Sequence, residues 1–188
     1  MFHSFKTEAV ILSRHNVGEA DKLLTLFTRE FGKKVVIAKG IRRTHSRRAP
    51  HLELFSHAQL ILHKGKRFDL VTEVESIEPF LHLRKKLERV AFVYIALELT
   101  GRMTAEAQES IDIFTQLLHF LQTLNGLTTT RKQAQQALIA FKQFMLEELG
   151  FMEGNLNISE ALLDIKIETV LERTLKSPAL LTNIQSGL

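Results

Sequence analysis

The chain has 188 residues, of which 45% are hydrophobic and 24% charged, which is the composition of a globular protein that can bury a core. It contains no cysteine, so disulfides, thiol catalysis and cysteine-ligated zinc are excluded. Its longest apolar run, residues 90–97, is too short to cross a bilayer, and its first residues lack the charged-then-apolar order of a signal peptide. We therefore expect a cytoplasmic protein with no membrane partner.

The positive charge of the chain is concentrated in its first part. Residues 1–80 hold 14 Lys or Arg against 9 Asp or Glu, whereas residues 81–188 hold 11 against 12. No acid stands between Glu30 and Glu53, where the bases are Lys33, Lys34, Lys39, Arg42, Arg43, Arg47 and Arg48. Such a regional excess favours a polyanionic partner over a solvated loop whose bases serve solubility alone.

The first 79 residues have the short apolar period of β-strands. Strands are predicted at residues 9–14, 23–28, 34–38 and 57–63, the last alternating cleanly between two faces. Lys64-Gly65 predicts a hairpin turn into a strand at residues 67–75, of which one face carries Phe68, Leu70, Thr72 and Val74. Five short strands with bases in the loops predict a small closed barrel, of the oligonucleotide-binding (OB) or the SH3-like type.

Pro79 marks the border after which the apolar period becomes helical. Four helices are predicted, at residues 83–97 with a stop at Gly101, from a Thr104 cap to Asn125-Gly126, at residues 131–149 closed by Gly150, and from a Ser159 cap to Lys176 before Ser177-Pro178. Four such helices bury one another as a bundle. The predicted class is α+β, with an OB barrel at residues 1–79 and an all-helical domain at residues 80–188.

Motifs for covalent chemistry are missing from the sequence. The eight histidines are dispersed without metal-ligand spacing, and the sequence has no Gly-x-Ser-x-Gly, no phosphate-cradling glycine loop and no paired-carboxylate nuclease motif. Glu19 and Asp21 could hold Mg²⁺, but beside a turn such residues more often cap backbone N–H groups. We therefore expect no enzyme activity, no catalytic residue, no metal and no cofactor.

Two groups of phenylalanines in the first 80 residues are expected to differ in role. Phe27 and Phe68 lie inside apolar alternations, which favours core packing. Phe31 and Phe55 border the basic stretch and are the better candidates for stacking on nucleobases.

Two stretches of the sequence carry a recognisable signature, GEADKLLTLFTREFGK at residues 18–33 and AKGIRRTHSR at residues 38–47. They resemble the N-terminal signature of the RecO family of bacterial recombination mediators and DNA-repair proteins. Residues 6–12 fit the first strand of that family, and residues 141–151, which end in Leu149-Gly150-Phe151, fit a helix end in its second domain.

The resemblance implies an OB barrel followed by a helical domain. It also implies a nucleoid-associated protein that binds single- and double-stranded DNA, anneals complementary strands and, with RecR and single-stranded-DNA-binding protein (SSB), helps to load RecA. The bases expected to contact DNA are Lys39, Arg42, Arg43, Arg47 and Arg48, supported by Lys33, Lys34, Lys64 and Lys66. No base-reading helix is recognisable, so sequence specificity should be weak.

The chain departs from the family pattern in two ways. It is shorter than the usual member, and residues 152–157 stand where many relatives carry a four-cysteine zinc module. We expect the barrel to bind DNA without that module, whereas a partner surface that the module would build is in doubt.

The resemblance further implies that the helical domain receives the short acidic, hydrophobic C-terminal peptide of SSB. Such a peptide needs an apolar pocket and a nearby base. The third predicted helix offers Leu138, Phe141 and Met145 on one face, with Lys142 beside them and Arg131 at the helix start. The alternative is that these apolar residues only pack the bundle, in which case the basic stretch at residues 84–89 is the next candidate.

Two other classes of function stay open from the residues. An RNA-binding barrel would keep the basic loop and prefer strands that carry 2′-hydroxyls. An interaction adaptor would act mainly through the helical domain.

Overall fold

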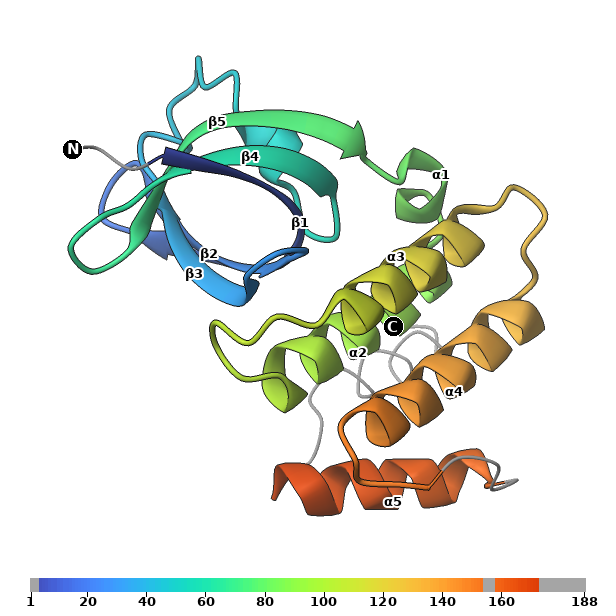
Figure 1. Ribbon diagram of the computed structural model, residues 1–188. Coiled ribbons are helices and arrows are strands. Elements are labelled where there is room, and N and C mark those ends of the chain that lie inside the picture. The colour runs from blue at the N-terminus through green and yellow to red at the C-terminus, as the bar shows by residue number, and fades with distance from the viewer. Residues whose placement is uncertain (1–3, 154–157, 173–188) are drawn as a thin grey trace. The chain divides into compact units, whose positions relative to one another are not determined.

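The computed structural model describes residues 4–153 and 158–172. Five strands come first, namely β1 (Ser4–Val17), β2 (Asp21–Thr28), β3 (Gly32–Ala38), β4 (His57–His63) and β5 (Asp69–Glu78), with the short 3-10 helix η1 (Ala49–Leu52) before β4. Helices follow, namely α1 (Leu81–Arg84), α2 (Leu87–Met103), α3 (Ile111–Asn125), α4 (Arg131–Glu148) and α5 (Glu160–Leu171). This order, visible in Figure 1, confirms the predicted α+β class.

The strands form a closed barrel in the order β1-β2-β3-β5-β4 (Figure 1). The long strand β1 pairs with β4 through its first half and with β2 through its second half. A short parallel pairing of β3 with β5, at Val36↔Asp69 and Ile37↔Leu70, closes the cylinder. The barrel is therefore of the predicted OB type.

The barrel core follows the two-residue period of the strands. Leu24 and Leu26 on β2, and Leu60 and Leu62 on β4, are fully buried, because alternate side chains of a strand point to the same face. For β4 this confirms the alternation predicted from the sequence of residues 57–63.

Strand β5 breaks this alternation. A bulge between Ile61 and Leu62 of β4 places Glu73 opposite Ile61 but Val71 opposite Leu62. Val71 is therefore buried, while Thr72 is exposed. The predicted shared face of Phe68, Leu70, Thr72 and Val74 is wrong, because a bulge moves every following side chain to the other face.

The chain divides into two compact units that are not continuous in sequence. One consists of the chain up to Pro79 together with Thr104–Phe114, and the other consists of Phe80–Met103 and the chain from Thr115 onward. The predicted division into domains at residues 1–79 and 80–188 stays a prediction. The first of these two units, which contains the strands, is called the barrel unit, and the second is called the helical unit.

The segment Thr104–Phe114 is anchored to the start of β3. The Ala107 N–H donates to the Lys33 carbonyl at 2.9 Å, and Phe114 stacks on Phe27 with 6.5 Å between ring centroids. A Cβ on Gly32 would lie 1.8 Å from the Gln108 carbonyl oxygen, and Gly32 has a φ of +61°, so only glycine fits there. Phe27 is fully buried, in the predicted core role.

The segment also moves the start of the second predicted helix. Thr104 does not cap α3, because that helix begins only at Ile111, and the Thr104 carbonyl accepts a hydrogen bond from Lys33 Nζ. Ser110 takes that place, since its Oγ accepts from the Ile113 N–H at 3.3 Å.

In the helical unit, local sequence signals set the helix starts. Thr130 and Gln133 form a capping box at the start of α4, and Ser159 caps α5 as predicted. Helix α2 continues through the predicted stop at Gly101 to Met103. The predicted last turns of α5 to Lys176, with Ser177-Pro178, lie outside the described residues.

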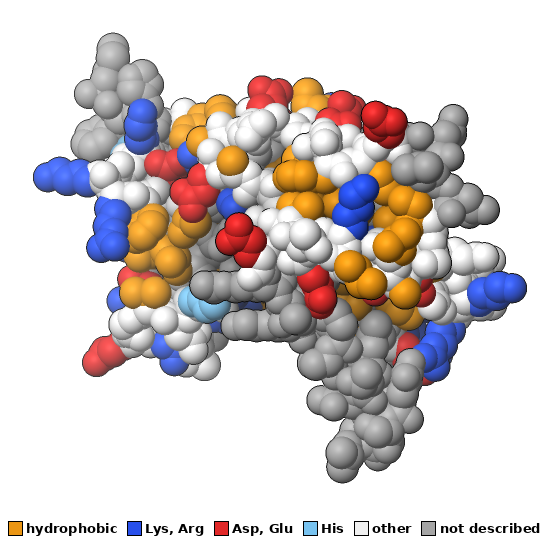
Figure 2. Space-filling view, turned by 90° about the horizontal axis from the view of Figure 1, so that it is seen from below, with side chains coloured by type: hydrophobic (Ala, Val, Ile, Leu, Met, Phe, Trp, Pro, Cys, Tyr) orange, Lys and Arg blue, Asp and Glu red, His pale blue; other side chains and the backbone are white. Residues whose placement is uncertain are grey.

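Helix α5 carries apolar residues on more than one face. Leu163 and Ile167 are fully buried, whereas Leu162 is 51% and Ile165 is 61% exposed. In the view from below, hydrophobic side chains gather over this lowest element of Figure 1 (Figure 2).

Among the described residues, no helix is long and apolar enough to span a membrane.

Candidate nucleic-acid interface

The loop that joins β3 to η1 carries most of the predicted DNA-contacting bases. We call residues 39–48 the basic loop. Ile41 anchors it, since only 4% of this side chain is exposed, while Arg42 and Arg43, which follow it, lie at the surface. Burying one apolar residue therefore orients its charged neighbours toward solvent.

The turn between β1 and β2 braces the basic loop. The Gly40 N–H donates to Asp21 Oδ1 at 2.7 Å, and the Arg42 N–H donates to the Ala20 carbonyl at 2.9 Å. Arg42 Nη1 also reaches the Gly18 carbonyl at 3.2 Å. Asp21 thus caps a backbone N–H group, which is the role that its position beside a turn favoured over Mg²⁺ binding.

Arg48 differs from the other bases of the loop because its guanidinium is used within the barrel unit. Nη1 donates to the Val71 carbonyl and Nη2 to the Lys39 carbonyl, both at 2.6 Å. The side chain is partly buried and ties the end of the loop to β5 and to the end of β3. Arg48 therefore positions the loop.

A hollow of about 800 Å³ opens on the basic loop. It is lined by Lys39, Arg43, Arg47 and Arg48, with Asp21, Gly40, His45 and Ser46. Lys39, Arg43 and Arg47 are exposed, and the Asp21 carboxylate accepts the Gly40 hydrogen bond. Several exposed bases in a concave surface can neutralise neighbouring phosphates of one nucleic-acid strand.

The four supporting lysines are placed elsewhere on the barrel unit, and two of them have partners in the protein. Lys34 Nζ lies 2.9 Å from Asp69 Oδ2 and 5.5 Å from the centre of the Phe5 ring. Burial lowers the pKa of Lys33, against the opposing effect of Glu106. Lys64 and Lys66 are exposed in the turn between β4 and β5.

Of the two phenylalanines predicted to stack on nucleobases, Phe31 and Phe55, one is exposed and the other is buried. Phe31 is 37% exposed, with its ring 4.8 Å from that of Phe5. Phe55 is only 3% exposed and has a φ of +52°, so its predicted stacking role is wrong: the chain turns the ring into the core. Phe68 precedes β5 and is partly buried under the guanidinium of Arg67, 5.2 Å from its ring centre.

Comparison with known proteins places this barrel in a family. Residues 1–80 match the family described as "Recombination protein O N terminal". A protein named DNA repair protein RecO from Roseiflexus sp. (strain RS-1) is 37% identical over 147 residues, which are 78% of this chain and 50% of that protein. The protein of the same name from Dehalococcoides mccartyi (strain ATCC BAA-2266 / KCTC 15142 / 195) is 35% identical over 149 residues, 79% of this chain and 57% of that protein.

The chain belongs to the RecO family. It spans about half the length of the curated relatives that it matches. The basic loop and the turn that braces it lie within the matched N-terminal region. The family membership predicted from residues 18–33 and 38–47 is thereby confirmed.

The RecO resemblance also predicted a peptide site on α4, and the structure places those side chains in the core of the helical unit. Leu138, Phe141 and Met145 are each at most 1% exposed, and Phe141 packs against Phe120 with 5.4 Å between ring centroids. They pack the bundle and present no surface to a peptide.

The basic residues named with that site are also engaged. Lys142 is 3% exposed, with Nζ 2.6 Å from Asp164 Oδ1 and 3.7 Å from Glu160 Oε1 on α5. Arg131 remains at the surface, 3.7 Å from Glu88. This face of α4 therefore serves packing and ion pairing within the helical unit.

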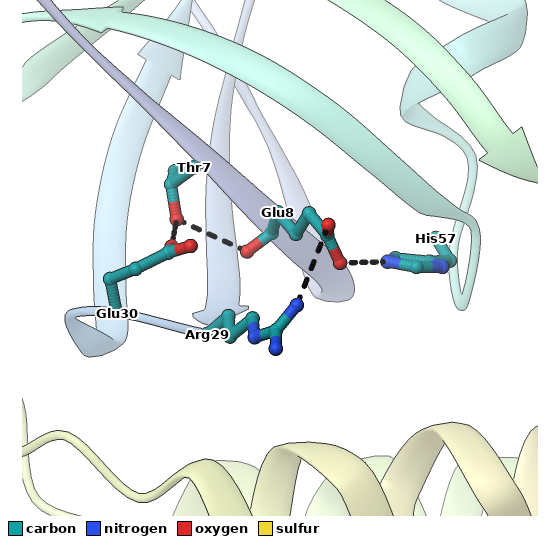
Figure 3. A network of polar contacts seen from close by, with 5 residues as sticks. All are labelled: Thr7, Glu8, Arg29, Glu30 and His57. Atoms are coloured by element: carbon teal, nitrogen blue, oxygen red, sulfur yellow. Dashed lines mark hydrogen bonds and ion pairs between the residues drawn. The ribbon is translucent and has the colours of Figure 1, made fainter.

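A polar network at the junction of β1, β4 and the turn between β2 and β3 contains the buried His57 (Figure 3). Glu8 Oε2 lies 3.2 Å from His57 Nε2, and Glu8 Oε1 lies 3.7 Å from Arg29 Nη1. Thr7 Oγ1 donates to Glu30 in the same network. Burial lowers the pKa of His57 despite the opposing effect of Glu8, which favours the neutral form of the ring.

This network is a structural one. The His57 ring meets the edge of Phe114 at 5.9 Å, which places it inside the packing of the barrel unit. Across residues 4–153 and 158–172, no three or more His, Asp or Glu side chains are grouped so that they could hold a metal ion. The basic loop is accordingly the candidate functional site of the barrel unit.

Proposed function

We propose that this RecO-family chain is a DNA-binding recombination mediator that acts in DNA repair without covalent catalysis. It binds single- and double-stranded DNA through the basic loop and anneals complementary strands. With RecR and SSB it assists the loading of RecA. The support for the partners is family membership, and we assign neither of them to a described surface.

One observation carries this proposal. Lys39, Arg42, Arg43 and Arg47 are exposed together on a loop that Asp21 and Arg48 fix to the barrel. Annealing requires two polyanions to approach against their mutual repulsion. Bases that contact phosphates release counterions and leave the Watson–Crick edges free to pair.

The mode of contact also argues for weak sequence preference. The exposed groups of the loop are ammonium and guanidinium ions at the end of a barrel, and phosphate contacts of this kind carry no sequence information. Equal binding of DNA and RNA oligonucleotides of one sequence would favour the general polyanion-binding barrel over a DNA mediator.

The direct test is annealing of complementary strands coated with SSB, in the presence and absence of the full chain. We expect the protein to accelerate annealing and the double variant Arg42→Glu/Arg43→Glu to lose most of that acceleration. The matched control is Lys6→Glu/Lys166→Glu, which changes the net charge equally outside the loop. No acceleration by the unmodified protein, or equal loss in the control, would refute the proposal.

A further inference from the structure

A second basic hollow lies in the helical unit, at the starts of α2 and α4. It has a volume of about 400 Å³. Its lining comprises Lys85, Lys86, Arg89 and Arg131, one acid, Glu88, and Leu87, Phe92 and Thr129. Four bases against one acid give this hollow an excess of positive charge, although residues 81–188 as a whole carry none.

Arg89 forms the built part of this hollow. Its side chain is buried, and its guanidinium donates to the carbonyls of Leu124 at 2.8 Å, Gly126 at 2.7 Å and Thr129 at 2.5 Å. These bonds fix the turn between α3 and α4. Within the described residues the guanidinium meets carbonyl dipoles rather than a carboxylate, so its charge is not cancelled by an ion pair.

The rim of the hollow is made of accessible bases. Lys85 and Lys86 are exposed at the junction of α1 and α2. Arg131 is about half exposed, and its ion pair with Glu88 is 3.7 Å long. An exposed ion pair of that length contributes little to stability. An incoming anion can therefore replace Glu88 as the partner of the Arg131 guanidinium at a small cost in free energy.

We infer that this hollow binds a backbone phosphate of a second DNA strand. The inference rests on the proposed function, because annealing needs each of two strands to have its own charge neutralised. The chemistry favours phosphate over an acidic peptide with an aromatic anchor. Phe92, which would form the apolar floor for such an anchor, is only 4% exposed. The capping box at Thr130 already occupies a backbone donor of α4, so the side chains carry the site.

The test uses the full chain and two non-complementary labelled oligothymidylates. The first strand is bound to immobilised protein, and capture of the second strand is then measured at low salt. We expect Lys85→Glu/Lys86→Glu to lower second-strand capture about tenfold and to leave first-strand affinity within about twofold. Lys85→Gln/Lys86→Gln, which removes charge without adding acids, should give a smaller loss in the same direction.

The control is again Lys6→Glu/Lys166→Glu, which should leave second-strand capture unchanged. Unchanged capture in the Lys85/Lys86 variants would overturn the inference. If these variants keep second-strand capture but lose binding of a peptide of alternating Asp and Phe, the hollow is a peptide site and the inference is also overturned. If instead Arg42→Glu/Arg43→Glu leaves first-strand affinity intact, the proposed function fails at the basic loop, independently of this result.

Discussion

The basic loop of the barrel unit and helix α4 of the helical unit both place bases directly beside apolar residues in sequence. In the loop, Ile41 is buried while Arg42 beside it is exposed. In α4, Phe141 and Lys142 are both buried. The same local pattern, a base next to a buried apolar residue, therefore leaves the base exposed in the loop and buries it in α4.

The difference comes from the partners available to the charge. No acid occurs in residues 31–52, and the Arg42 guanidinium contacts the Gly18 carbonyl. Lys142 meets Asp164 and Glu160, which come from a later helix. A buried charge is tolerated only when it is paired, and here the pairing is made by residues distant in sequence.

The largest expected effect is on the buried lysine. Lys142→Glu would place a carboxylate beside Asp164 and Glu160 in a buried position. We expect the free energy of unfolding to fall by about 3–5 kcal/mol, measured by urea denaturation. An unchanged stability would show that Lys142 behaves like the exposed bases of the loop.

The matched variant is Lys142→Met, which keeps an unbranched apolar side chain, one atom shorter, and removes the charge. Asp164 is partly exposed and can be solvated once it has lost its partner. We therefore expect a much smaller loss of stability than for Lys142→Glu. Equal losses would mean that packing, rather than charge, governs this position.

A second prediction separates two adjacent arginines of the basic loop. Arg48→Ala removes two hydrogen bonds to carbonyls and should lower the free energy of unfolding by about 2 kcal/mol. Arg47→Ala should leave stability unchanged and weaken DNA binding, because Arg47 is exposed in the hollow. Thermal unfolding and fluorescence anisotropy of the two variants give both quantities.

The same comparison fails if both variants lose equal stability, or if Arg47→Ala binds DNA as tightly as the unmodified chain. Either result would remove the distinction between a positioning arginine and a phosphate-contacting one.

A third prediction extends the comparison to His57, which is buried beside Glu8 with Glu78 and Arg29 also acting on it. Burial lowers the pKa of His57 below its ordinary value of 6.5, so the unfolded chain binds more protons than the folded chain just below that pH. Stability should therefore fall as the pH drops below about 6.5. His57→Gln should flatten this part of the stability profile.

The control for His57 is His15→Gln, at an exposed position of β1. It should leave the slope of stability against pH unchanged. A profile that keeps its full slope in His57→Gln would assign the pH dependence to other groups.

Features set by local sequence could be predicted. The alternation in β4 and the Ser159 cap each depend on residues within a few positions along the chain. The basic loop was found by the same means, because the lack of acids is itself a local property.

Features set by distant contacts could not be predicted. The burial of Val71 depends on a bulge in the pairing of β4 with β5, and the role of Thr104 depends on contact with Lys33. Phe55 turns inward through a left-handed backbone that no glycine signals. The burial of Lys142 has no local signal, because its ion-pair partners Glu160 and Asp164 lie 18 and 22 residues further along the chain.

The salt dependence of single-strand binding tests the central claim most directly. With four exposed bases in the basic loop and about −0.7 per phosphate contact, log affinity against log salt should have a slope of about −2.8. Arg42→Glu/Arg43→Glu should reduce the slope to about half. The affinity should fall by a similar factor for every sequence tested. A slope near zero, or one that the double variant leaves unchanged, would contradict binding through this loop.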